Sequence, residues 1–207
     1  MTDRDYWIKK LSDYSFQQWV TQPSLFAEDT VKYFPPTGAI LELGAGNGQD
    51  GKWFASLGYN LTMTDLTDAP SKTDLPKTIK TLVVDMAQPL PFRNESFDVV
   101  YSHLGVHYFS LDRTQELFDE IYEILKPDGI FAFLVNSVND PEMQEGEEIE
   151  SNFRLVGGIE KRFFDISTTN QLTTKFETVL IDGQGTSHKD KTKGLANLIR
   201  FVGKKNK

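Results

Sequence analysis

The stretch that decides the fold is Ala39-Ile40-Leu41-Glu42-Leu43-Gly44-Ala45-Gly46-Asn47-Gly48. Its first half is short and apolar, which is typical of a buried strand. Its second half carries glycine at every other position, and glycine permits both a tight turn and a close approach of backbone to ligand. A helix is expected over residues 52–57, ending at Gly58. A strand that leads through such a turn into a helix presents backbone N–H groups to a ligand.

The residues on either side of this unit show strand and helix patterns in alternation. A helix is expected over residues 111–125, where apolar residues recur at helical spacing. Strands are expected at 60–65, 81–84, 97–102, 130–135, 176–181 and 196–202. No helix fits between the last two strands, so they should pair antiparallel. The pattern predicts an α/β fold, a Rossmann-like, open, mostly parallel seven-stranded sheet with an antiparallel C-terminal hairpin and an N-terminal helical arm.

The length of 207 residues predicts one domain. Its expected parts are an N-terminal arm or lid (1–38), a ligand-binding core (39–136), a substrate-side insertion (137–175) and a C-terminal hairpin (176–207). The arm is rich in aromatic residues, and Tyr14 and Trp19 foremost are predicted to close over a bound ligand. The alternative is an arm that packs permanently on the outer face of the sheet.

Composition narrows the range of partners. The net charge of −8 disfavours nucleic acid and anionic membrane surfaces. The absence of cysteine excludes disulfides, thiolate metal sites and a cysteine nucleophile, and no metal site is expected. The longest apolar run, residues 130–135, is too short to span a membrane. Since the N-terminus lacks a signal-peptide pattern, we expect a cytoplasmic protein, whose oligomeric state the sequence does not fix.

Polar residues follow the predicted strands at the points where ligands bind in open α/β sheets. Asp65 ends the second strand, twenty-one residues after Gly44, where an acid can accept hydrogen bonds from both hydroxyls of a ribose. Asp85 ends the third strand, and Ser102 and His103 end the fourth. For Asp85 the alternative role is the cap of a helix or turn. The pattern predicts a nucleoside-containing ligand in one crevice at this edge of the sheet.

Two residues near the glycine turn bear on which ligand this is. The dinucleotide fingerprint Gly-x-Gly-x-x-Gly fails, because its last position is Gln49. Glu42 is poorly placed beside a pyrophosphate and suits a ligand with a cationic amino group. A nicotinamide-dependent oxidoreductase has the same strand, turn and ribose-binding acid. It is kept as an alternative function, although the missing third glycine and Glu42 count against it.

Three blocks of sequence resemble the class I S-adenosylmethionine-dependent methyltransferases. Residues 40–48 resemble motif I of that family, and residues 91–100 and 125–129 resemble its later blocks. The resemblance covers residues 38–136 well and the tail only by pattern. It implies an S-adenosyl-L-methionine cofactor and a methyltransferase. The compact form resembles the tellurite-resistance and small-molecule branch of the family.

The resemblance also implies roles for the residues at the predicted crevice. The turn Gly44-Ala45-Gly46 would lie against the methionine part of the cofactor, with Glu42 ordering the turn or binding the amino group. The residues expected on the nucleoside are Asp65 on the ribose hydroxyls, Leu66 on the adenine ring, Asp85 on the adenine amino group, and Met86 through its backbone amide. Ser102 and His103 would lie near the sulfonium.

Methyl transfer from a sulfonium is an in-line displacement, so the protein mainly has to align donor and acceptor. A general base is needed when the acceptor arrives protonated. His103 and His107 are the candidate catalytic residues, although His107 also fits a packed loop residue.

Other sequence features indicate a small-molecule acceptor. Family members that methylate adenine or glutamine amides carry Asn/Asp-Pro-Pro-Tyr after the fourth strand, where this chain has residues 102–105, Ser-His-Leu-Gly. A non-catalytic S-adenosylmethionine-binding protein is the remaining alternative.

The insertion is rich in acids, and we interpret it as a solvated loop. The alternative is a lid that favours a cationic or metal-bearing acceptor. Phe153, Phe163 and Phe164 within it are expected to pack in the core. The basic clusters at 189–193 and 204–207 are expected to form a hairpin loop and a frayed tail.

Overall fold

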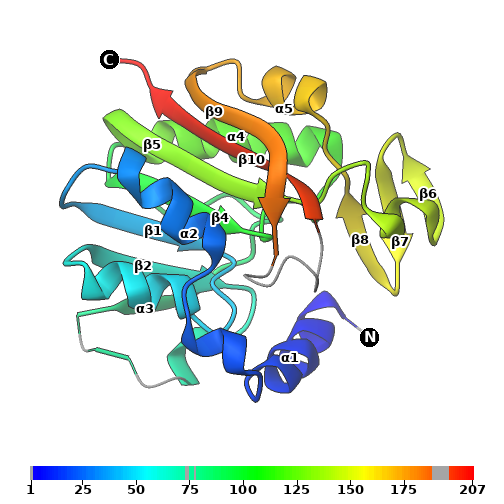
Figure 1. Ribbon diagram of the computed structural model, residues 1–207, viewed down its shortest axis with the longest axis horizontal. Coiled ribbons are helices and arrows are strands. Elements are labelled where there is room, and N and C mark those ends of the chain that lie inside the picture. Colours follow the sequence, from blue (N-terminus) through cyan, green and yellow to red (C-terminus); the bar gives the residue numbers. More distant parts are fainter. Residues whose placement is uncertain (1, 73–74, 77, 188–195) are drawn as a thin grey trace.

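The computed structural model describes residues 2–72, 75–76, 78–187 and 196–207, without the side chains of residues 18 and 19. Its centre is a seven-stranded sheet in the order β3-β2-β1-β4-β5-β10-β9 (Figure 1). The strands are β1 Ala39–Leu43, β2 Asn60–Asp65, β3 Lys80–Val83, β4 Phe97–His103, β5 Leu125–Val135, β9 Phe176–Thr186 and β10 Ala196–Lys205. The pairs among β1 to β5 are parallel, and β10 runs antiparallel to both β5 and β9. The predicted fold is confirmed.

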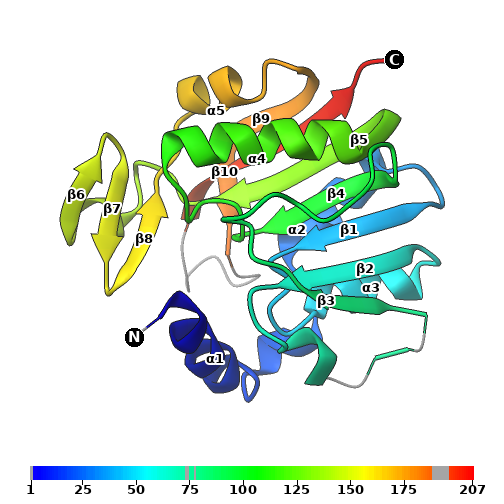
Figure 2. The same ribbon diagram turned by 180° about the vertical axis from the view of Figure 1, so that it is seen from behind.

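Alternate residues of each strand pack on opposite faces of this sheet. On β1, Ile40 packs on the side of α2 (Leu25–Thr30) and α3 (Gln49–Ser56), whereas Leu41 and Leu43 pack on the side of α4 (Leu111–Ile124). Figure 1 shows α2 and α3 in front of the sheet, and Figure 2 shows α4 covering the other face. Because both faces are covered, the middle of β4 at residues 99–101 and the second half of β5 at residues 130–135 are apolar.

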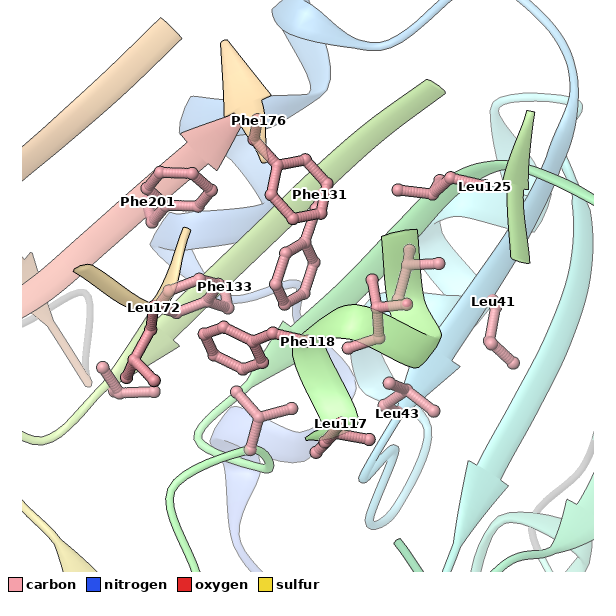
Figure 3. Close-up of a cluster of buried hydrophobic side chains, with 14 of the residues drawn as sticks. Leu41, Leu43, Leu117, Phe118, Leu125, Phe131, Phe133, Leu172, Phe176 and Phe201 are labelled. Carbon is pink, nitrogen blue, oxygen red and sulfur yellow. The ribbon is translucent and has the colours of Figure 1, made fainter. Parts of the chain in front are cut away.

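Phenylalanines dominate the core on the α4 side (Figure 3). The ring of Phe133 on β5 stacks on that of Phe201 on β10, with centroids 5.0 Å apart. Phe118 of α4 lies 5.1 Å from both Phe131 and Phe133. These contacts join α4 and β5 to the C-terminal hairpin, so they hold the antiparallel strands against the parallel part of the sheet.

The arm is helical, as predicted, and its two halves differ in how they pack. The first half is α1 (Asp3–Tyr14), which starts at a capping box between Thr2 and Asp5. The second half comprises η1 (Gln18–Thr21), α2 and η2 (Val31–Tyr33). Phe26 of α2 stacks on Tyr101 of β4, with ring centroids 5.5 Å apart. In contrast, Leu11 is the buried residue of α1, which stands beside the sheet rather than on its face (Figure 1).

The insertion corrects the expectation of a solvated loop. It contains η4 (Pro141–Gln144) and a three-stranded antiparallel sheet of β6 (Glu147–Glu150), β7 (Phe153–Val156) and β8 (Ile159–Arg162), followed by α5 (Ile166–Leu172). The β7–β8 hairpin turns at Gly157-Gly158, and both glycines have positive φ. A two-residue Gly-Gly turn between apolar residues is a hairpin signal that the sequence reading missed. Phe153, Phe163 and Phe164 are buried, as expected.

Several boundaries also differ from the prediction. Helix α3 starts at Gln49 rather than at residue 52, and β5 starts at Leu125 rather than at residue 130. The tail was expected to fray, but β10 continues to Lys205. The buried ammonium of Lys205 donates to the carbonyl oxygens of Tyr122 and Leu125, each at 2.8 Å. The predicted loop cluster at 189–193 lies outside the described residues. In the described part of the chain, no helix has the length and apolar character needed to cross a membrane.

Candidate active site

A cavity of about 520 Å³ lies at the C-terminal ends of β1, β2 and β4. This volume is in the range of sites for small molecules and cofactors. Its walls come from α1, the glycine turn, the ends of β2 and β4, and the loops that follow them. The described residues that line it are Trp7, Leu11, Tyr14, Gln17, Glu42, Gly44, Ala45, Gly46, Asn47, Gln49, Asp50, Asp65, Leu66, Met86, His103, Leu104, Gly105, Tyr108 and Ser187.

The glycine turn forms the floor of the cavity. Gly44 and Gly46 have φ angles of 72° and 54°, in the left-handed region where a side chain is strained. A Cβ on Gly44 would lie 3.0 Å from Cα of Gly105, because the loops after β1 and β4 touch at this point. The predicted turn is therefore open to a ligand on one side and closed by backbone on the other.

Asp65 lies beside this turn and braces it. Its Oδ2 accepts a hydrogen bond from the backbone N–H of Gly46 at 3.0 Å. Its Oδ1 accepts from the backbone N–H and the hydroxyl of Thr67, both at 2.9 Å. A carboxylate has about four acceptor positions. Asp65 can therefore hold the turn and still accept a further hydrogen bond from a ligand in the cavity.

Glu42 lines the cavity and is 3% exposed. Burial, together with the negative charges of Asp50 and Asp65, raises the pKa of Glu42 well above its ordinary value. Its Oε2 has no hydrogen-bond partner among the described residues. A buried polar atom without a partner is destabilising. This oxygen is shielded from solvent and lies against Gly51 of α3, so it does not face the open part of the cavity.

Asp50, at the start of α3, is a site residue that the sequence reading missed. Its Oδ1 accepts from the backbone N–H of Ser24 at 2.6 Å, and its Oδ2 accepts from the hydroxyls of Ser24 and Tyr101 at 2.8 and 2.7 Å. These donors come from the arm and from β4, so one carboxylate joins the arm, α3 and the sheet. Nothing in the local sequence around Asp50 indicates these long-range partners.

Asp85 and Ser102 do not line the cavity. Asp85 is exposed and its Oδ1 accepts from the backbone N–H of Ala87 at 2.9 Å, which is the role of a turn cap. Ser102 is fully buried, because its position on β4 points the side chain into the sheet, where it donates to the carbonyl oxygen of Leu43 at 2.9 Å. Neither residue lines the cavity, whereas the residues that directly follow them in sequence, Met86 and His103, do.

The structure also separates the two candidate histidines. His103 lines the cavity, whereas His107 does not and is 1% exposed. Burial, with smaller contributions from the positive charges of Lys161 and His103, lowers the pKa of His107 to about 3. Its imidazole is therefore neutral at physiological pH and packs at 4.2 Å from the ring of Tyr108. His103 is the histidine that can contact a bound substrate.

Aromatic side chains form part of the cavity wall. Trp7 and Tyr14 of α1 line the cavity together with Tyr108, which the sequence reading missed. The rings of Trp7 and Tyr108 meet edge to face with centroids 5.1 Å apart. The side chain of Asn47 donates to the carbonyl oxygen of Leu11 at 3.2 Å and so joins α1 to the glycine turn. The predicted lid residue Trp19 has a side chain outside the described part of the chain.

The chain is similar to known methyltransferase domains. Residues 41–133 match a family model described as a methyltransferase domain. An uncharacterized protein of Methanocaldococcus jannaschii is 29% identical over 196 residues, which cover 80% of this chain and 75% of that protein.

Solved structures show the same fold. A complex between the Haloferax volcanii Trm112 methyltransferase activator and a methyltransferase matches with a TM-score of 0.71 at 18% identity, covering 100% of this chain and 99% of that one. The 1,6-didemethyltoxoflavin-N1-methyltransferase of Burkholderia thailandensis, solved with 1,6-didemethyltoxoflavin and S-adenosylhomocysteine, matches with a TM-score of 0.72 at 16% identity, covering 99% and 87%.

The raised pKa of Glu42 predicts how stability depends on pH. The folded state keeps the Glu42 proton at pH values where the unfolded chain loses it, which is above about 4.3. Above that pH, the unfolded state is therefore increasingly favoured, and this residue lowers the free energy of unfolding as the pH rises. We expect Glu42→Gln to remove this slope, so that the variant gains stability relative to the original chain between pH 5 and pH 8.

Urea unfolding at a series of pH values measures this effect. Glu160→Gln is the matched control, because Glu160 is exposed and its replacement should leave the slope unchanged. Parallel pH profiles for Glu42→Gln and the original chain would show that Glu42 is ionised in the folded protein.

Proposed function

We propose that this chain, a class I S-adenosylmethionine-dependent methyltransferase, transfers the methyl group to a small molecule that binds in the cavity above the glycine turn. The observation that carries the proposal is the juxtaposition in one cavity of the turn, Asp65 and Glu42 with an aromatic wall that contains Tyr108. The first group suits a nucleoside that carries an amino-acid chain, and the aromatic wall offers apolar surface next to it.

The residues present fit the cofactor. We assign the methionine part to the turn Gly44-Ala45-Gly46, with Glu42 beside it to order the turn or bind the ammonium group. We assign the ribose hydroxyls to Asp65 and the adenine ring to Leu66 and Met86. Asp85 is assigned to the turn that positions Met86, because its carboxylate caps that turn.

A nicotinamide dinucleotide fits this site less well. Its pyrophosphate would lie at the glycine turn, close to the buried carboxyl groups of Glu42 and Asp50. Bringing phosphates next to buried acids is unfavourable. The alternative of an oxidoreductase is therefore not supported by the charges around the turn.

The shape and charge of the cavity support a small acceptor. None of the described lining residues is lysine or arginine, which are the residues that contact nucleic-acid phosphates. The aromatic wall offers stacking area for a flat or cationic molecule. The Burkholderia neighbour was solved with a small molecule bound. The cytoplasm is the compartment that the sequence predicts for this reaction, and membership of the tellurite-resistance branch stays a prediction.

S-adenosylmethionine supplies an activated methyl group on a sulfonium, so the protein has to provide alignment more than acid–base chemistry. The glycine turn and Asp65 would fix the donor, and the aromatic wall would hold the acceptor in line. His103 is the lining residue that could accept a proton from an acceptor that arrives protonated. Trp7, Leu11 and Tyr14 would exclude water from the reacting atoms.

Calorimetry tests the assigned cofactor. S-adenosylmethionine should bind and NADH should not. Asp65→Ala should weaken S-adenosylmethionine binding by roughly 1.5–3 kcal/mol, the range for hydrogen bonds to a charged group. Asp119→Ala is the control and should bind normally, since Asp119 of α4 pairs with Lys175 and does not line the cavity. Equal affinity of the original chain and Asp65→Ala would remove Asp65 from the site.

An acceptor panel tests the assigned reaction. With tritiated S-adenosylmethionine, we expect label to pass to neutral or cationic small molecules and not to transfer RNA or to unfolded protein. Labelling of a polymer alone would overturn the proposed acceptor class. Binding of the cofactor without turnover on any acceptor would favour the non-catalytic alternative.

The arm provides a test of gating. We propose that α1 opens to admit ligand and closes over it, because α1 contributes three lining residues and buries little of its own surface. Hydrogen exchange over residues 6–26 should therefore slow when S-adenosylmethionine is added. Residues 117–124 of α4 serve as the internal control and should not respond. Equal exchange of the arm with and without cofactor would indicate a permanently packed arm.

A further inference from the structure

The loop between β4 and α4 carries Tyr108 into the cavity. This residue meets Trp7 of the arm edge to face on one side and the ring of buried His107 on the other. It therefore forms the wall that lies between the lid and the sheet. Its side chain is part of the cavity wall that we assign to the methyl acceptor.

Arg162, at the end of β8 in the insertion, holds this loop on both sides of Tyr108. Its backbone N–H donates to the carbonyl oxygen of His107 at 2.7 Å. Its Nε donates to the carbonyl oxygen of Phe109 at 3.1 Å. The two carbonyl groups that flank Tyr108 in sequence are thus bound by one residue, which does not itself line the cavity.

The surroundings of Arg162 keep it in this place. Its side chain is buried, its guanidinium pairs with Glu150 of β6, and it lies 5.0 Å from the ring centroid of Phe153. Glu150 also accepts from the backbone N–H of Leu111 at 2.7 Å and so binds the start of α4. Burial lowers the pKa of Arg162 to about 10, which leaves the guanidinium charged at neutral pH. The second half of the loop, from His107 to the start of α4, is therefore tied to the insertion.

We infer that Arg162 is a positioning residue for the acceptor side of the active site, which it controls by fixing Tyr108. This inference rests on the proposed function, because it takes Tyr108 as a wall against the transferred methyl group. The inference gives the insertion a role in the reaction, although none of its described residues lines the cavity. It also explains why a buried arginine is held at the end of a small peripheral sheet.

Two cofactor analogues separate this role from a general effect on folding. S-adenosylhomocysteine carries no group at the position of the transferable methyl, whereas sinefungin carries a primary amine there. The ratio of their dissociation constants therefore reports on the acceptor side without an identified acceptor. We expect Arg162→Met to weaken sinefungin binding at least fivefold more than S-adenosylhomocysteine binding, as measured by calorimetry on the full chain.

Arg154→Met is the matched control. Arg154 lies on β7 of the same sheet, and its guanidinium binds Glu148 and the carbonyl oxygens of Glu145 and Gly146, all within the insertion. We expect its replacement to leave the ratio of the two constants unchanged. The backbone N–H of residue 162 still binds the carbonyl oxygen of His107 in this variant, so an unchanged ratio in a folded Arg162→Met would overturn a positioning role for the Arg162 side chain and leave the cofactor assignment intact.

Two further variants keep the test decisive if Arg162→Met does not fold. Tyr108→Leu changes the wall directly and should alter the ratio in the same direction; a normal ratio would refute the inference. Arg162→Lys keeps a positive charge near Glu150, but its single ammonium group cannot replace the guanidinium that binds both Glu150 and the carbonyl oxygen of Phe109. Its ratio should therefore fall between those of the original chain and Tyr108→Leu. A ratio equal to that of the original chain would show that the guanidinium is not needed. If the original chain binds neither analogue, the proposed function fails, and the positioning role fails with it.

Discussion

The site depends on the contact between two backbone loops where no side chain fits. Gly44 after β1 and Gly105 after β4 meet so closely that a Cβ on Gly105 would lie 2.7 Å from the carbonyl oxygen of Leu43 and 3.3 Å from Cα of Gly44. The close contact between Gly44 and Gly105 fixes the position of the cavity floor. The hydroxyl of Ser102 joins the same two strands, and the carboxylate of Asp65 holds the turn from the other side. The depth of the cavity thus follows from two glycines and two short polar bridges.

The buried acids around this floor are satisfied unequally. Asp50 accepts three hydrogen bonds from Ser24 and Tyr101, whereas the Oε2 of Glu42 accepts none from the described residues. An unpartnered buried acceptor lowers stability, and such groups concentrate at functional sites. The two acids therefore differ in surroundings, since Asp50 joins structural elements through its hydrogen bonds and Glu42 is a buried acid that lines the cavity. These surroundings could not be assigned from the residue type alone.

The parts of the site that could be predicted are those fixed by neighbours in sequence. The strand and turn at residues 39–48 and the acid at Asp65 follow from local periodicity and from where a parallel strand ends. For Asp85 the structure shows the turn-capping contact that the sequence left as an alternative, because the chain turns directly after β3, and its role toward the cofactor stays a prediction. Asp50, Tyr108 and Arg162 were missed because their roles come from partners far along the chain. No local pattern encodes such long-range contacts. The β7–β8 hairpin is a different case, because its Gly-Gly turn is a local signal that could have been recognised.

The position of β10 has a consequence for how the protein is made. This strand occupies residues 196–205 yet lies in the interior of the sheet, between β5 and β9. Phe131 and Phe133 of β5 cannot meet Phe201 until that stretch has been synthesised. During translation, the edge of β5 and the apolar face around it therefore stay uncovered while residues 136–195 emerge. The nascent chain is exposed to aggregation over this interval, and a stop codon before residue 196 would remove a central strand rather than trim a tail.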